Sequence, residues 1–153
     1  MINLKINGLS LSVEKGTTIL EAARFLGFPI PTLCHKDGLT PYGACRLCVV
    51  EIGEFPRTRL VSSCTYPVEE GLVVRTASER VVKARKIIIE LLLASCPQSK
   101  IVQDIASAHG VRQQRFRQEH EDCILCGLCV RMCKEQMMAG AIGFRGRGQA
   151  RSL

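Results

Sequence analysis

The cysteines are the residues whose type and spacing suggest chemistry. The chain has nine of them. One set has the spacing C-x10-C-x2-C-x15-C and comprises Cys34, Cys45, Cys48 and Cys64. Thiolates bind soft metals such as iron, zinc and Cu(I). A zinc ribbon would usually pair two C-x2-C turns, and this set has only one. Its first three members lie in a Gly- and Pro-rich stretch, which favours a loop around a [2Fe–2S] cluster, with the fourth ligand supplied by a separate segment.

The second set is C-x2-C-x2-C-x3-C, which is the ligand spacing of bacterial [4Fe–4S] ferredoxins. It comprises Cys123, Cys126, Cys129 and Cys133. Gly127 lies within the run and permits close approach of the backbone. Lys134 stands where this motif usually has proline. We therefore expect a [4Fe–4S] centre here, with Cys133 as the least certain of the four ligands.

A cysteine-rich chain can instead be a secreted disulfide framework. The opening MINLKINGLSLSVEKG has no apolar stretch of signal-peptide length, and the longest apolar run is interrupted by Glu90. These features predict a cytoplasmic protein without a membrane span, in which the thiols ligate metal.

The net charge of +7 alone would suggest nucleic-acid binding. However, tryptophan is absent and aromatic residues make up only 5% of the chain. Two four-thiolate clusters would also reduce the formal charge to about +3, because each carries about −2 when oxidised. We therefore expect no nucleic-acid partner, and the remaining arginines can form a docking face for an acidic protein.

The elements that position these cysteines are short. Residues 2–6 and 9–13 alternate apolar and polar side chains around Asn7-Gly8, which predicts a β-hairpin. Thr18 and Glu21 fit a capping box that begins a helix ending at Gly27. Further strands are expected at 49–52, 59–61 and 72–75.

From Ser78 onward the spacing of apolar residues becomes helical and continues to Cys96-Pro97. The apolar positions of this helix are Val81, Val82, Ala84, Ile87, Ile88, Leu91 and Leu92. A second helix is expected at about residues 100–109, capped by Ser99 and stopped by Gly110. The predicted fold class is α+β, with a [2Fe–2S] domain at residues 1–77, a helical linker at 78–115 and a [4Fe–4S] segment at 116–153.

Four stretches together resemble the N-terminal part of the large iron–sulfur subunit of respiratory complex I. They are the hairpin and the segments PTLCHKDGLTPYGACRLCVVEI, SSCTYPVEEG and CILCGLCVRMC. Relatives of that subunit include diaphorase subunits of NAD-linked hydrogenases and the N-terminal arms of some formate dehydrogenases and iron-only hydrogenases. The resemblance implies a β-grasp ferredoxin domain, a helical linker and a bacterial-ferredoxin-like domain. It also implies electron transfer between a flavin/NAD(P)H-oxidising subunit and a second redox subunit.

Two departures from that family matter. Many relatives have a further [4Fe–4S] site in the linker, held by one histidine and three cysteines, whereas the linker here has only Cys96. Relatives also commonly have a second C-x2-C-x2-C-x3-C run, and none precedes Leu153. We expect half of a ferredoxin-like domain. Three alternatives are open: Cys133 closes its own cluster, Cys96 or a partner chain supplies the fourth thiolate, or further sequence completes a second [4Fe–4S] cluster.

Other polar candidates receive ordinary interpretations. His35 is expected to be solvent-exposed, His109 to end a helix, His120 to precede the second motif, and Cys96 to be a small buried hydrophobe. No dinucleotide fingerprint or nucleophile–base pair suggests catalysis by this chain alone. The alternatives to a relay subunit are a free two-cluster ferredoxin or redox sensor and a zinc-based nucleic-acid module.

Overall fold

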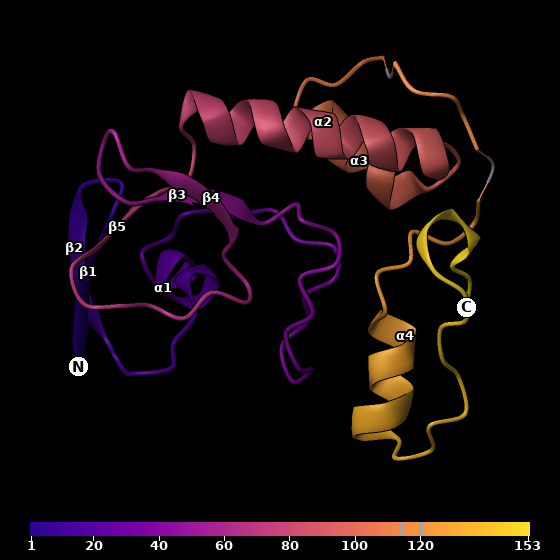
Figure 1. Cartoon of the computed structure of the whole chain (residues 1–153), viewed down its shortest axis with the longest axis horizontal. Helices are drawn as coiled ribbons and strands as arrows, with labels where there is room; N and C mark the ends of the chain where they lie inside the picture. Colours follow the sequence, from indigo (N-terminus) through magenta and orange to yellow (C-terminus); the bar gives the residue numbers. More distant parts are fainter. Residues whose placement is uncertain (114, 120) are drawn as a thin grey trace.

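The structure is a computed structural model that describes residues 1–113, 115–119 and 121–153. Its N-terminal part is a mixed five-stranded sheet in the order β2-β1-β5-β3-β4 (Figure 1). Strands β1 and β5 pair in parallel and the other neighbours pair antiparallel. The strands are β1 (Ile2–Ile6), β2 (Leu9–Val13), β3 (Val49–Ile52), β4 (Arg59–Ser62) and β5 (Leu72–Arg75).

The local signals for the hairpin and first helix are confirmed. Asn7 and Gly8 both have positive φ, 50° and 88°, as a type I′ turn requires. Helix α1 (Ile19–Phe25) begins at a complete capping box, in which Thr18 and Glu21 each bond the other's backbone N–H. Gly27, at φ 77°, follows the helix in the left-handed conformation expected there.

The core of this part lies between α1 and the sheet. Fully buried side chains from three strands and the helix meet there, including Ile6, Leu20, Val50 and Val74. Burial of such a side chain stabilises a fold by about 1.5–3 kcal/mol. Cys48 and Cys64 belong to the same cluster. Two of the predicted ligands therefore belong to the buried core of this part.

Helices α2 (Glu79–Ser95) and α3 (Lys100–Ala108) follow and pack against each other. Their predicted extents are confirmed, but the expected apolar face of α2 is only partly correct. Val82, Ile87 and Leu91 are exposed, and the buried side instead includes Ile89 and Arg85. Both sides of α2 carry aliphatic residues, so periodicity alone could not select the buried one.

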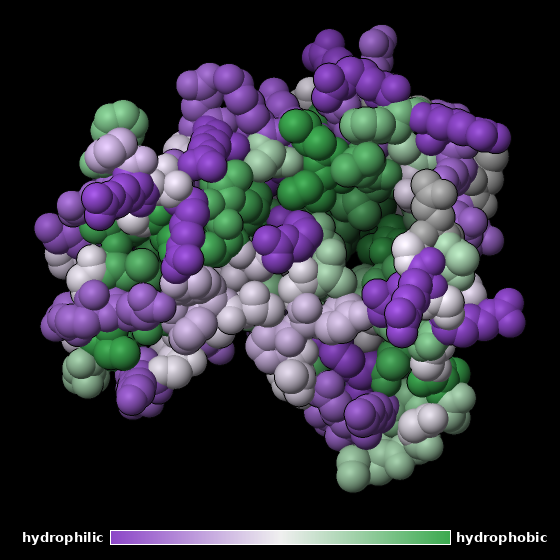
Figure 2. Space-filling view, viewed as in Figure 1, coloured by the Kyte–Doolittle hydropathy of each residue, from purple (hydrophilic) through white to green (hydrophobic). Residues whose placement is uncertain are grey.

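Packing of α2 and α3 reaches the cysteine loop. Leu47 lies between two predicted ligands and is fully buried in a cluster with Ile89 of α2, Ala106 of α3 and Val111. The loop thereby packs against the helical pair. The exposed apolar side of these helices contributes to the hydrophobic area seen at the upper centre of the space-filling view (Figure 2).

The C-terminal segment is mostly irregular. It contains α4 (Leu128–Arg131), a π-helical turn η1 (Met132–Gln136) and a 3-10 turn η2 (Gly148–Ala150). An antiparallel bridge joins Arg145 and Ser152. In the part of the chain that the structure describes, no helix has the length and hydrophobicity needed to cross a membrane.

Candidate iron–sulfur site

Residues 28–48 form the expected irregular loop between α1 and β3. Gly43 has φ 68°, and a Cβ on this residue would lie 3.1 Å from Cγ2 of Thr65, the neighbour of Cys64. The loop therefore approaches the returning segment more closely than a larger residue would allow.

The four predicted ligands of the first set are brought together. The Sγ atoms of Cys48 and Cys64 lie 3.3 Å apart, and the backbone N–H of Cys45 donates to Sγ of Cys34 at 3.5 Å. Cys34, Cys48 and Cys64 are each only 1% exposed. A disulfide would require about 2.05 Å between sulfurs, and all four are free thiols.

Mutual hydrogen bonding changes the proton affinities of these thiols. The hydrogen bond with Cys45 holds the pKa of Cys34 far below its usual range and raises that of Cys45. The hydrogen bond with Cys64 lowers the pKa of Cys48 to about 6, while bonds with Cys34 and Cys48 raise that of Cys64. Such contacts show that the sulfurs face one another, as the thiolate ligands of one centre must.

The surroundings also fit an iron–sulfur cluster. Within the described residues, three buried polar atoms have no hydrogen-bond partner: His35 Nδ1, Ser62 Oγ and Arg85 Nε. His35 lies in the cysteine loop beside Cys34, and Ser62 ends β4 two residues before Cys64. Polar atoms around thiolate ligands commonly tune a metal centre. The exposure predicted for His35 is wrong, because its side chain is only 8% exposed and its Nε2 lies 3.2 Å from Asp37. The burial depends on how the loop folds, which no local sequence pattern reveals.

The second set lies on one continuous segment. Leu125 and Gly127 have positive φ, 52° and 72°, so the backbone turns sharply between the first three cysteines. Backbone N–H groups of Leu125 and Ala141 donate to the sulfurs of Cys123 and Cys133 at 3.4 Å and 3.2 Å. Sharp turns and N–H groups directed at sulfur are features that iron–sulfur ligation uses.

Exposure differs among the members of this second set. Cys123 and Cys129 are exposed, whereas Cys126 and Cys133 are half-buried. Across residues 1–113, 115–119 and 121–153, no three His, Cys, Asp or Glu side chains are gathered as ligands of a single metal ion. The ligand roles of both cysteine sets thus stay predictions: Cys34, Cys45, Cys48 and Cys64 for a [2Fe–2S] cluster, and Cys123, Cys126, Cys129 and Cys133 for a [4Fe–4S] centre.

The remaining candidates fall close to expectation. Cys96 is buried at 1% exposure, and burial raises its pKa. The backbone N–H of Glu119 donates to Ala94 at 2.7 Å, which brings the start of the second motif beside the end of α2. His109 ends α3, as predicted, and its Nδ1 bonds the carbonyl of Ile105. His120 lies outside the described residues.

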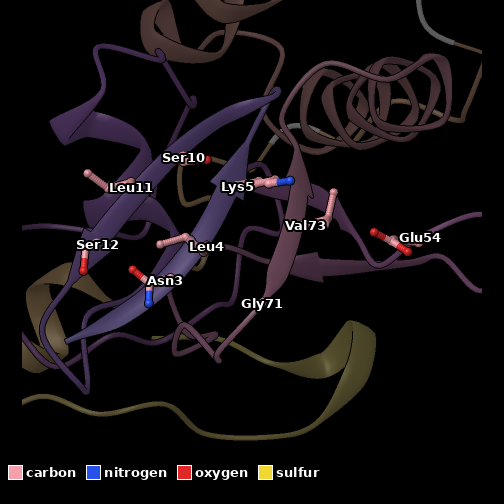
Figure 3. Close-up of a pocket in the computed structure, with 9 residues that line it drawn as sticks. All are labelled: Asn3, Leu4, Lys5, Ser10, Leu11, Ser12, Glu54, Gly71 and Val73. Atoms are coloured by element: carbon pink, nitrogen blue, oxygen red, sulfur yellow. The ribbon is translucent and has the colours of Figure 1, made fainter.

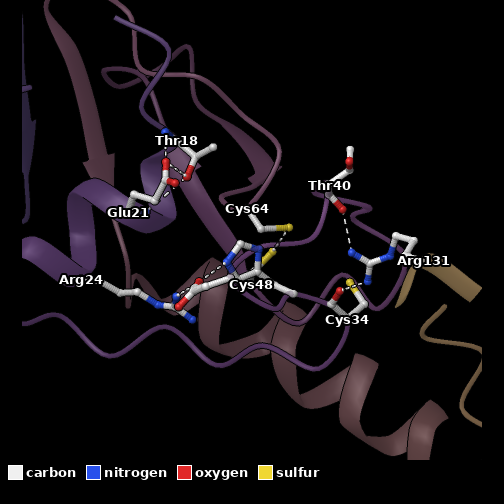
Figure 4. Close-up of polar contacts among 10 residues, drawn as sticks. Thr18, Glu21, Arg24, Cys34, Thr40, Cys48, Cys64 and Arg131 are labelled. Carbon is white, nitrogen blue, oxygen red and sulfur yellow. Dashed lines mark hydrogen bonds and ion pairs between the residues drawn. The ribbon is translucent and has the colours of Figure 1, made fainter. Parts of the chain in front are cut away.

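Two buried arginines near the first site were missed by sequence reasoning. Arg131 donates to the carbonyl oxygens of Cys34 and Thr40, the latter at 2.6 Å (Figure 4). Arg85 of α2 donates to the carbonyl oxygen of Val49, next to Cys48, at 2.8 Å. The sequence did offer one signal for Arg85: it lies four residues from Val81 and from Ile89, on the same side of the helix as these apolar residues. The contact of Arg131 spans 97 residues, and no local pattern predicts it.

A shallow groove on the outer sheet face is distinct from the cysteine site (Figure 3). Side chains of β1, β2 and β5 line it, among them Lys5, Ser10 and Val73. It is open and mixed in polarity, without a cysteine among the lining residues. We assign it no part in the chemistry.

Known proteins resemble this chain over most of its length. The chain is 34% identical over 98% of its length to NADPH-Fe(3+) oxidoreductase subunit alpha of Geobacter sulfurreducens. It is 31% identical over 96% of its length to the mitochondrial NADH-ubiquinone oxidoreductase 78 kDa subunit of Candida albicans. It covers 20% of the first relative and 24% of the second, so it spans a quarter of their length or less. The matched regions are longer than this chain, so those relatives carry internal segments that it lacks.

A solved structure resembles nearly the whole chain. It is an NAD+-reducing [NiFe]-hydrogenase in the H2-reduced state, with a TM-score of 0.85 and 31% identity over 98% of this chain and 73% of that one. Residues 1–79 match the family described as 2Fe-2S iron-sulfur cluster binding domain. That range contains the four converging thiols, and on these grounds the chain belongs to this family of [2Fe–2S] cluster-binding domains.

Proposed function

We propose that this chain is an electron relay between an NAD(P)H-oxidising flavin module and a second redox module of a multisubunit oxidoreductase. The observation that carries the proposal is the convergence of four thiols from a loop and a returning segment. Cys34, Cys45, Cys48 and Cys64 hold the [2Fe–2S] cluster in this proposal. Such clusters pass single electrons, and the chain's part is to hold and shield them.

The second centre in the proposal is a [4Fe–4S] cluster bound by Cys123, Cys126 and Cys129, with Cys133 as the weakest ligand. Close packing supports it. A Cβ on Gly127 would lie 3.1 Å from Tyr42 of the first loop, so the two cysteine segments are in contact. Proximity of this kind is what one-electron transfer between two centres needs.

The domain organisation follows from the same assignments. Residues 1–77 form a β-grasp ferredoxin domain, 78–115 a helical linker and 116–153 half of a bacterial-ferredoxin-like domain. The sheet order, with parallel β1 and β5 at its centre and α1 packed on one face, supports the first of these.

The relatives support the kind of partner. Their names describe subunits of NADPH- or NADH-linked oxidoreductases, and the similar structure is an NAD+-reducing hydrogenase. Hydride transfer from a nicotinamide needs a cofactor that converts two electrons into single-electron steps, which a flavin supplies. A flavin-containing subunit is therefore the proposed electron donor or acceptor of this chain.

The test is an assay of NAD(P)H oxidation with an artificial acceptor. The purified chain should show none until a flavin-containing partner, co-purified from the native complex, is added. Reduction of the chain's clusters should then follow NAD(P)H addition. Substantial activity of the chain alone, or no reduction through any co-purified flavoprotein, would contradict the relay.

A further inference from the structure

One side chain, Arg131, ties the two cysteine segments together. It ends α4, between Cys129 and Cys133, and is only 8% exposed. Its guanidinium donates to the carbonyl oxygens of Cys34, Thr40 and Gly127 through Nη2, Nη1 and Nε. The guanidinium thus bonds two backbone positions of the first cysteine loop and one position within the second cysteine motif.

Further contacts join the same two segments. The backbone N–H of Thr40 donates to Glu135 Oε2 at 2.7 Å, and Gln136 Nε2 donates to the carbonyl of Gly38 at 2.7 Å. Arg131 also lies over the ring of Tyr42, 5.4 Å from its centroid. The tip of the first loop is therefore held by α4 and η1 rather than by its own sheet.

Within the described residues, the charge of Arg131 is paired with no carboxylate. A buried cation without an opposite charge is costly. A four-thiolate cluster beside Cys34 would carry about −2 and compensate it.

We propose that Arg131 is the positioning residue that fixes the [4Fe–4S] segment against the [2Fe–2S] loop, and that its charge raises the potential of the [2Fe–2S] centre. This inference rests on the proposed function, because it requires both clusters. A fixed positive charge favours the reduced state, which is the more negative one. Lysine would keep the charge but not the planar fork that reaches three carbonyls.

The experiment compares Arg131→Met, Arg131→Lys and the exposed control Arg147→Met in the full chain. Iron content is measured first. The [2Fe–2S] potential is then titrated by electron paramagnetic resonance, and hydrogen exchange is followed at the Thr40 amide, which Glu135 protects only when the segments are docked.

Arg131→Met should shift the [2Fe–2S] potential to a more negative value, by roughly tenfold in the reduction equilibrium or about 59 mV. It should also speed exchange at Thr40 by about tenfold or more. Arg131→Lys should speed exchange but keep a potential close to the wild type, and Arg147→Met should change neither. Wild-type exchange and potential in Arg131→Met would overturn the proposal.

If Arg131→Met does not fold, the positioning role is tested with Arg131→Lys alone. Unchanged hydrogen exchange at the Thr40 amide in Arg131→Lys overturns the positioning role. Failure of the proposed function gives a different result. Wild-type protein without a four-iron signal contradicts the relay, whereas the exchange at Thr40 still reports whether Arg131 docks the segments.

Discussion

The sulfur atoms of Cys48 and Cys64 lie 3.3 Å apart, although one ends the cysteine loop and the other follows β4. Pairing of β3 with β4 causes this proximity, because Val49 is opposite Ser62 and the residues flanking the paired strands must meet. The sheet thereby places the fourth ligand beside the third.

Cys48→Ala should remove the two-iron signal and about two irons per chain, since it leaves one iron of the [2Fe–2S] cluster with a single protein thiolate. Cys96→Ala is the matched control for the two-iron signal, because Cys96 is as deeply buried and lies outside the predicted [2Fe–2S] set. It should retain the two-iron signal. Equal losses in both variants, measured by iron analysis and resonance spectra, would show that the iron is lost through unfolding and not through a missing ligand.

Much of the N-terminal fold was predictable because its signals are local. Asn7-Gly8 fixes the hairpin turn, and Thr18 with Glu21 begins the first helix, each through contacts within a few residues. Three predicted ligands of the first cysteine set likewise lie in one loop, Cys34, Cys45 and Cys48.

What escaped prediction depends on packing between distant segments. His35 is buried, and on α2 the side chain of Arg85 is buried while that of Leu91 is exposed. In each case the burial depends on which other segments pack against the residue. Arg131 meets Cys34 only because the C-terminal segment folds back onto the first loop. No periodicity or motif encodes such contacts.

Arg85→Met should destabilise the protein and make the [2Fe–2S] potential more negative. The variant leaves the carbonyl of Val49 without its donor, at a cost of about 1–3 kcal/mol, and removes a buried charge close to Cys48. Lys86→Met, on the exposed side of the same helix, is the control. Thermal unfolding and redox titration check both effects, and identical behaviour of the two variants would contradict the role given to Arg85.

Glu51 should stabilise the fold in a pH-dependent way. Hydrogen bonds from Ser78 and Thr58, followed by Arg75, lower its pKa to about 2 from an ordinary 4.5. A depressed pKa adds stability that is fully present above pH 4.5 and is lost as the pH falls toward 2.

Glu51→Gln should therefore unfold more easily than the wild type at neutral pH, by about 1–2 kcal/mol once solvent screening is considered. The difference in melting temperature should stay constant down to about pH 4.5 and shrink below it. Glu14→Gln, on an exposed residue, should match the wild type throughout. A difference that grows on acidification would contradict this account.

Cys133→Ser should retain most of the four-iron centre, whereas Cys129→Ser should lose it. In two-cluster ferredoxins the fourth cysteine of a run ligates the other cluster, so Cys133 is the member of this run that is not expected to bind the cluster of Cys129. Iron content and resonance spectra distinguish the two variants. Equal loss in both would show that Cys133 binds the same cluster as Cys129.

The most direct test of the central claim is metal analysis of the anaerobically isolated chain, combined with electron paramagnetic resonance of its reduced form. We predict about six irons per chain, with separate two-iron and four-iron signals, because the two cysteine sets have these ligand spacings. Stoichiometric zinc with little iron and no two-iron signal would contradict the claim.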